Sequence, residues 1–344
     1  MSKVQHITVG PDESEQRLDR WFRRHFPQVG QGRVEKLCRK GDIRVNGGRV
    51  KASTRVVPGQ DIRIPPMPDS PAPVHETRTM SADDVRLIQE TVLFRDDHLI
   101  VINKPSGLAS QGGSGQTRHV DGLAEALKFG LVEKPRLVHR LDKDTSGILV
   151  LARTQRMATA LTAAFRHRET RKIYWAAVAG VPLPRMGTIK FGLIKASGGK
   201  SGNEKMRCVH PDELGTTTGA KRATTDYAVL SKLGNRAAWV ALAPITGRTH
   251  QLRAHMAEIG HPVIGDGKYG GSGQENLGDG WGAQLGGDHS KRLHLHARSL
   301  RFEHPANRSV MSFTAPLPEH MKKTWAEVEW HADDVPEDPF EGEG

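Results

Sequence analysis

The sequence predicts a mixed α/β protein of the α+β class, in which a small helix–helix–hairpin domain precedes a larger, sheet-centred domain. Three observations predict this: apolar residues at helical spacing near the amino terminus, a proline-rich stretch after them, and later apolar runs typical of strands. A chain of 344 residues fits two domains. The predicted segments are a first domain (1–65), a linker (66–90), a second domain (91–318) and an acidic tail (319–344).

The first domain begins with two predicted helices. One face of the first helix carries four apolar side chains, Leu18, Trp21, Phe22 and Phe26. The second helix repeats this spacing with Val34, Leu37 and Cys38, and Gly41 ends it. Residues 43–50 then fit two short strands around an Asn-Gly turn, and residues 61–64 fit a closing strand.

The linker and the second domain follow from composition and periodicity. Prolines 65, 66, 68, 71 and 73 cannot continue a helix or a sheet and indicate a semi-stiff linker. Strands are predicted at 93–94, 99–102, 148–151, 173–179, 225–230 and 237–242, and helices at 121–129, 154–166 and 251–259. Residues 195–222 and 270–290, rich in Gly, are predicted surface insertions without catalytic residues.

Charge is distributed unevenly along the chain. The formal net charge is +11, and residues 327–344 hold eight acidic side chains and no Lys or Arg, so the preceding residues carry +19. A basic body favours a nucleic-acid partner, although an ordinary solvated surface also fits charge alone. An acidic tail can mask the basic surface or be disordered, and disorder is predicted here.

The first domain has the densest basic surface, with fourteen bases against seven acids in residues 1–65. This density predicts phosphate contacts, and a protein-docking module is the alternative. The predicted RNA-binding residues are Arg17, Arg20, Arg33, Lys36, Arg39, Lys40, Arg44 and Lys51.

The cysteine content and the distribution of apolar residues indicate the cellular location of the protein. Cys38 and Cys208 form no Cys-x-x-Cys pair, which argues against a disulfide framework and a zinc knuckle. The amino terminus lacks an apolar signal core, and no run of about 18 uncharged apolar residues occurs. We expect a cytoplasmic, soluble protein that contacts no membrane.

One polar loop concentrates groups capable of chemistry. An apolar strand leads from Leu137 into residues 139–147, and apolar residues 148–151 resume directly afterwards. Rigid strands can hold reactive groups in such a loop. Asp and Ser/Thr side chains also satisfy turn backbones, and Asp144 fits that role, so composition leaves both interpretations open.

The loop residues His139-Arg-Leu-Asp-Lys-Asp-Thr-Ser-Gly147 resemble the active-site signature of the RluA family of pseudouridine synthases. Four further segments resemble that family in the expected order: 171–180, 246–255, 260–270 and 295–305. The first domain resembles the S-four type of RNA-binding domain at residues 16–19, 39–47 and 57–61. Together the resemblance covers about residues 14–65 and 90–315.

The resemblance implies a catalytic domain built on a mainly antiparallel mixed sheet, and it implies site residues. Asp142 matches the nucleophile, Tyr174 the active-site tyrosine, and Arg253 the arginine that pairs with the aspartate. Arg140 matches the arginine that helps to displace the target base, and His139 is placed with it as a substrate-binding residue. Isomerising uridine involves no redox change, so no cofactor is expected.

The chemistry agrees with these roles. As a nucleophile, Asp142 must stay ionised in a largely apolar pocket, and Arg253 can favour that form through two parallel hydrogen bonds. Tyr174 offers a flat face for a flipped uracil and a phenol that can relay a proton. No metal is expected, because His250 and His255 are five residues apart with no glutamate between them, unlike His-Glu-x-x-His.

The predicted function is therefore an RNA pseudouridine synthase, monomeric and free of metal, that acts on large-subunit ribosomal RNA. The resemblance is strongest to the RluC type, and the RluD type, with other targets, is the alternative. Two rivals remain: a non-catalytic ribosome-assembly factor that keeps the fold, and a metal-dependent RNA hydrolase. The presence of Asp142, Tyr174 and Arg253 argues against the first.

Overall fold

The computed structural model describes residues 4–13, 16–67, 80–112, 118–165, 170–196, 205–270 and 292–341. The chain forms two compact units, Met1–Thr79 and Met80–Gly344. Helix α3 (Ala82–Glu90) belongs to the second unit, so the linker is shorter than the sequence predicted. Prolines 68, 71 and 73 lie outside the described residues.

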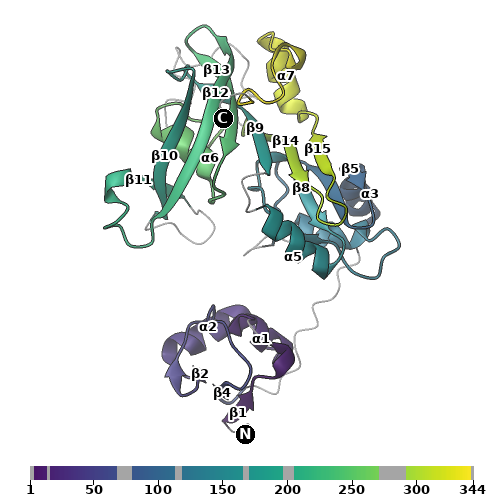
Figure 1. Ribbon diagram of the computed structural model, residues 1–344, viewed down its shortest axis with the longest axis vertical. Coiled ribbons are helices and arrows are strands. Elements are labelled where there is room, and N and C mark those ends of the chain that lie inside the picture. The colour runs from purple at the N-terminus through teal and green to yellow at the C-terminus, as the bar shows by residue number, and fades with distance from the viewer. Residues whose placement is uncertain are drawn as a thin grey trace. The chain divides into compact units, whose positions relative to one another are not determined.

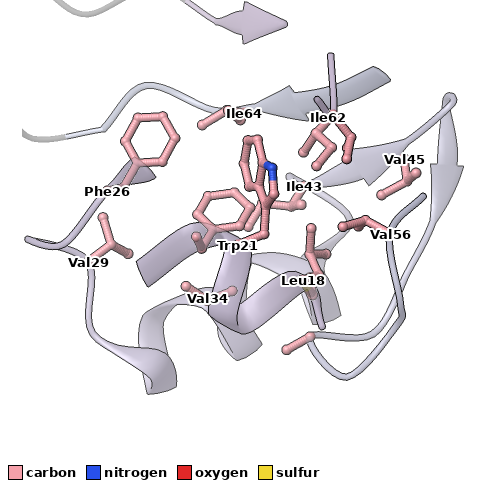
Figure 2. Close-up of a cluster of buried hydrophobic side chains, with 14 of the residues drawn as sticks. Leu18, Trp21, Phe26, Val29, Val34, Ile43, Val45, Val56, Ile62 and Ile64 are labelled. Atoms are coloured by element: carbon pink, nitrogen blue, oxygen red, sulfur yellow. The ribbon is translucent and has the colours of Figure 1, made fainter. Parts of the chain in front are cut away.

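The first unit consists of two helices and a four-stranded sheet. Helices α1 (Leu18–His25) and α2 (Gln31–Lys40) confirm the predicted pair, and Gly41, at φ 79°, ends α2. The sheet has the order β1-β4-β2-β3, from Gln5–Thr8, Asp61–Ile64, Arg44–Val45 and Gly48–Arg49. Strand β1 was not predicted. Figure 2 shows the core, where Leu18, Trp21 and Phe26 meet the aliphatic side chains of the strands.

The second unit is centred on one large sheet. Its described strands run in the order β11-β10-β12-β13-β9-β14-β8-β6-β5, with β15 on β14 and β7 on β8. Their bounds are β5 Val92–Arg95, β6 Leu99–Lys104, β7 Arg136–Leu137, β8 Ser146–Ala152, β9 Arg171–Ala179, β10 Met186–Lys195, β11 Met206–Val209, β12 Lys221–Leu233, β13 Ala237–Pro244, β14 Leu295–Glu303 and β15 Val310–Thr314. Only the pair β14–β8 is parallel among the described pairs, which confirms a mainly antiparallel mixed sheet.

Helices cover this sheet along its length. Helix α5 (Gln155–Ala164) packs on β8, and α6 (Gln251–Glu258) lies beside β10 and β12 (Figure 1). A short helix pair, α4 (Val120–Leu123) and η2 (Ala124–Leu127), contacts α3. The helices predicted at 121–129, 154–166 and 251–259 are thus confirmed.

One predicted insertion is partly regular. Within residues 195–222, strand β11 pairs with β10, and the 3-10 turn Pro211–Glu213 follows it. Strand β11 is only four residues long, and the alternation of Met206 and Cys208 is too short to predict a strand from the sequence. Residues 197–204 and 271–291, which include nearly all of the second predicted insertion, lie outside the described residues.

The predicted disorder of the acidic tail is wrong. Helix α7 (Glu319–Glu327) buries Met321 and Trp325 in a core with Trp175 and Trp239, and Trp330 joins them. Asp338 then accepts two hydrogen bonds from Arg171 of β9, at 2.6 and 2.9 Å. The prediction relied on the many acidic residues of this segment. A count of charges does not register Trp325 and Trp330, whose rings bury a large apolar area.

Candidate active site

The backbone on both sides of Asp142 is fixed by two buried polar side chains. Ser110 Oγ donates to the carbonyl of Leu141 (2.7 Å) and accepts from its N–H (3.0 Å). Lys104 Nζ donates to the carbonyls of Lys143 (3.0 Å), Pro105 (2.9 Å) and Leu108 (2.7 Å). Burial lowers the pKa of Lys104 to about 7, while the carboxylates of Asp144 and Asp142 oppose this. These hydrogen bonds therefore hold the loop backbone on both sides of Asp142 in place.

The exit of the loop joins β8 to β14. Ser146 and Gly147 pair with His296 and Ala297 in the parallel register, and Ser146 Oγ lies 2.9 Å from His296 Nδ1. Gly147 has φ 109°, and a Cβ there would lie 2.3 Å from the carbonyl oxygen of Ala297. Only glycine fits, so the final residue of the loop signature has a steric cause.

Tyr174 lies on β9 at the centre of the sheet. It pairs with Leu242 of β13 on one side and Ala297 of β14 on the other. Burial raises the pKa of Tyr174 well above its ordinary value, and the charge of Asp142 adds to this. The phenol therefore stays neutral and can donate a proton.

Arg253 of α6 connects Asp142 to a second carboxylate. Its Nη1 lies 3.3 Å from Asp142 Oδ2, while Nε and Nη2 each donate to Asp266 at 2.7 Å. The two parallel hydrogen bonds predicted for Asp142 are thus made to Asp266. The side chain of Asp266 has no exposed surface and needs the paired contact, whereas that of Asp142 keeps 26 % exposure.

His139 and Arg140 lie differently in the loop. His139 Nε2 accepts from the N–H of Val150 in β8 at 2.9 Å, and its ring packs edge-on against Phe165. Burial lowers the pKa of His139 to about 3, with Lys172 adding to the effect, so its neutral ring has only Nδ1 left for a substrate. Arg140 is exposed, two residues before Asp142.

All eight predicted RNA-binding residues of the first unit are exposed. Two of them also make contacts within the unit. Arg17 pairs with Asp19 at 2.6 Å, and Arg44 donates to the carbonyls of Gly41 and Gly47. A basic surface is therefore present, while the RNA contact itself stays a prediction.

Neither a membrane-spanning helix nor a metal-binding cluster occurs in the described part of the chain. No helix there is long and apolar enough to span a membrane, and no three His, Cys, Asp or Glu side chains gather as a metal site would require. Three buried histidines instead contact side-chain hydroxyl groups. His255 contacts Thr225, His296 contacts Ser146, and His294 contacts Thr324.

Comparison with known proteins identifies this arrangement. The family model for RNA pseudouridylate synthase matches residues 98–258. The ribosomal large subunit pseudouridine synthase C of Vibrio vulnificus is 35 % identical over 332 residues, covering 94 % of this chain and 96 % of that protein. The chain belongs to the RNA pseudouridylate synthase family. A namesake from Haemophilus influenzae is also 35 % identical, over 93 % and 94 % of the two chains.

Solved structures agree with this membership. Human RNA pseudouridylate synthase domain containing 4 is 30 % identical, with a TM-score of 0.56, and the match covers 71 % of this chain and 95 % of that one. Domain containing 1 reaches 26 % identity and a TM-score of 0.51 over 66 % and 83 % of the two chains. The family predicted from the motifs is confirmed, and the protein is an RNA pseudouridine synthase, an isomerase.

Sequence reasoning missed the residues that support the site. Asp266 and Tyr269 lie within the motif of residues 260–270 but were not predicted as site residues, and neither were Lys104 and Ser110. A buried lysine at the end of an apolar strand, as in Ile100-Val-Ile-Asn-Lys104, was a usable signal, because lysine is seldom buried without a cause. The pairing of Arg253 with Asp266 had no such signal.

Proposed function

We propose that this protein isomerises specific uridines of large-subunit ribosomal RNA and that Asp142 is its nucleophile. The observation that carries the proposal is the partly exposed Asp142 carboxylate, which Arg253 contacts, within the loop that forms the family signature. Relatives named ribosomal large subunit pseudouridine synthase C match nearly the full length, which supports this target class and the RluC-type assignment over the RluD type.

The reaction needs few protein groups. The N1–C1′ bond of uridine breaks, uracil turns, and a C5–C1′ bond forms, while C5 loses a proton and N1 gains one. The Asp142 carboxylate provides the electron pair that attacks the nucleotide. Arg253 donates a hydrogen bond to that carboxylate and places its positive charge beside it. Tyr174 supports the detached ring, and its neutral phenol is a proton donor near it.

The target uridine must leave its helix before it can react. Extrusion costs a few kcal/mol, and the exposed guanidinium of Arg140 is suited to fill the vacated place. The basic first unit supplies the phosphate contacts that hold the RNA during this step. We further propose that the protein works as a monomer in the cytoplasm.

The first prediction concerns the reacting group. Asp142→Asn keeps the size of the side chain but removes its negative charge, so the isomerisation rate should fall by at least about three orders of magnitude. Chemical mapping of pseudouridines in ribosomal RNA, from cells carrying only this variant, should show at least one site lost. RNA binding by the purified variant should persist.

Asp144→Asn is the matched control. It makes the same chemical change two residues away, on an exposed side chain, and should leave the pseudouridine map intact. An unchanged map with Asp142→Asn would refute the proposed nucleophile. Loss of RNA binding together with activity would instead indicate a structural role for Asp142.

A further inference from the structure

A second group approaches Asp142 on the same side as Arg253. His250, directly before α6, has its Nε2 3.7 Å from Asp142 Oδ2, the oxygen that Arg253 Nη1 also contacts at 3.3 Å. The backbone of His250 has φ 52°, a left-handed conformation that holds the residue in the turn into α6. Its side chain is nine-tenths buried, with 10 % exposure.

Tyr269 determines which nitrogen of His250 carries the proton. Tyr269 Oη accepts a hydrogen bond from the N–H of Met206 at 2.8 Å and lies 3.1 Å from His250 Nδ1. Because the backbone N–H can only donate, the phenol proton is free to point at Nδ1, which then acts as the acceptor. The proton of the neutral imidazole therefore sits on Nε2, facing Asp142.

The groups around His250 favour that neutral form. Burial lowers the pKa of His250, and the cations Arg253 and Lys268 add to this, while the carboxylates of Asp142 and Asp266 oppose it. A neutral ring with Nε2–H can donate to Asp142 without transferring a proton to it. Asp266 and Tyr269, from one loop, thus each orient one of the two groups that face Oδ2.

We propose that Tyr269 is a positioning residue that fixes His250 as the Nε2–H tautomer, so that His250 and Arg253 hold Asp142 Oδ2 and leave Oδ1 to meet the uridine. The inference rests on the proposed function of Asp142. Among the described residues Oδ1 receives no hydrogen bond, in keeping with this division of the carboxylate. The 3.7 Å separation between His250 Nε2 and Asp142 Oδ2 is longer than a hydrogen bond, and the proposal requires it to shorten in the substrate complex.

Kinetics of the Tyr269→Phe variant test the inference. The variant keeps the ring that lies against Arg253 but frees His250 to place its proton on Nδ1. We expect the single-turnover rate on ribosomal RNA to fall about tenfold near pH 8, with RNA affinity within about twofold. The deficit should narrow only at pH values below the lowered pKa of His250, because the imidazolium carries a proton on both nitrogens. His250→Gln, which carries an amide donor, should recover part of the activity that His250→Ala loses.

Tyr227→Phe is the control for losing one tyrosine hydroxyl, since Tyr227 Oη donates to the carbonyl of Pro184 at 2.9 Å. It should keep the full rate. An equal loss in both phenylalanine variants would reduce Tyr269 to ordinary packing. A wild-type rate for Tyr269→Phe would overturn the inference outright.

A measurement without RNA separates this inference from the proposed function. Nitrogen-15 NMR of the full chain, with the His250 signals assigned by comparison with His250→Asn, reports the tautomer directly. We expect Nε2–H in the wild type and a mixture in Tyr269→Phe, whereas Nδ1–H in the wild type would refute the proposal. If the wild type makes no pseudouridine in ribosomal RNA, the proposed function fails while the tautomer is still decided.

Discussion

Gly147 shows how one residue can fix the position of the reactive loop. It ends the loop that carries Asp142 and enters β8 against the backbone of Ala297, which lies on β14 next to Tyr174 on β9. A Cβ would lie 2.3 Å from one backbone atom of Ala297 and 2.6 Å from another, and φ 109° disfavours any side chain. Backbone atoms cannot move aside as a flexible side chain does.

Gly147→Ala should therefore separate β8 from β14. The strain and the clash together should lower the free energy of unfolding of the second unit by at least about 3 kcal/mol. Urea unfolding measures this. Gly215→Ala is the control, because a Cβ there meets nothing within 4 Å, and its unfolding should stay near wild type. Equal stability of the two variants would contradict the steric account.

At the scale of elements, the carboxyl-terminal segment is part of the second unit. Helix α7 and the residues after it complete a cluster of Trp175, Trp239, Trp325 and Trp330, with edge-on ring contacts between 4.7 and 5.4 Å for three of the pairs. Arg171 stands at the start of β9, the strand that carries Tyr174, and both its pairing with Asp338 and its contact with Phe340 fix the segment there.

Trp330→Ala should destabilise the second unit by about 3–5 kcal/mol, the usual result of truncating a buried tryptophan. Thermal or urea unfolding of the full chain measures the loss. Asp334→Asn changes charge in the same segment at an exposed position and should shift stability by less than about 0.5 kcal/mol. A larger effect for Asp334→Asn than for Trp330→Ala would show that charge, not packing, holds the segment.

At the scale of the whole molecule, charge and chemistry belong to different units. The first unit presents the dense basic surface, and the second holds Asp142, Tyr174 and Arg253. Phosphate contacts do not depend on base sequence, whereas the proposed reaction at Asp142 acts on a single uridine. RNA affinity and catalysis should therefore respond to different substitutions.

The triple variant Lys36→Gln, Arg39→Gln, Lys40→Gln on α2 tests this division. Each phosphate contact contributes about 0.7–0.9 to the slope of log affinity against log salt, so the slope should flatten by about 2. Fluorescence anisotropy with a large-subunit ribosomal RNA fragment measures it. Glu35→Gln, on the same helix, removes a negative charge and should not flatten the slope. An unaltered slope in the triple variant would exclude α2 as the RNA anchor.

Several features were predictable because they depend on neighbours in the chain. Helical spacing of Leu18, Trp21 and Phe22 predicted α1, and the polar residues between two apolar runs located the loop of Asp142. Strands β10, β11 and β15 were not predicted. Each contains polar or small residues, which are compatible with a strand only because neighbouring strands pair with it.

The sequence by itself determined the family, the reaction class and the position of Asp142, because these follow from a contiguous signature and from local periodicity. The tertiary structure alone decided that Arg253 divides its hydrogen bonds between Asp142 and Asp266, and that Tyr269 reaches His250. Those contacts join residues from separate elements. Their geometry depends on how the strands and α6 pack, and this packing cannot be derived from the order of residues in the chain.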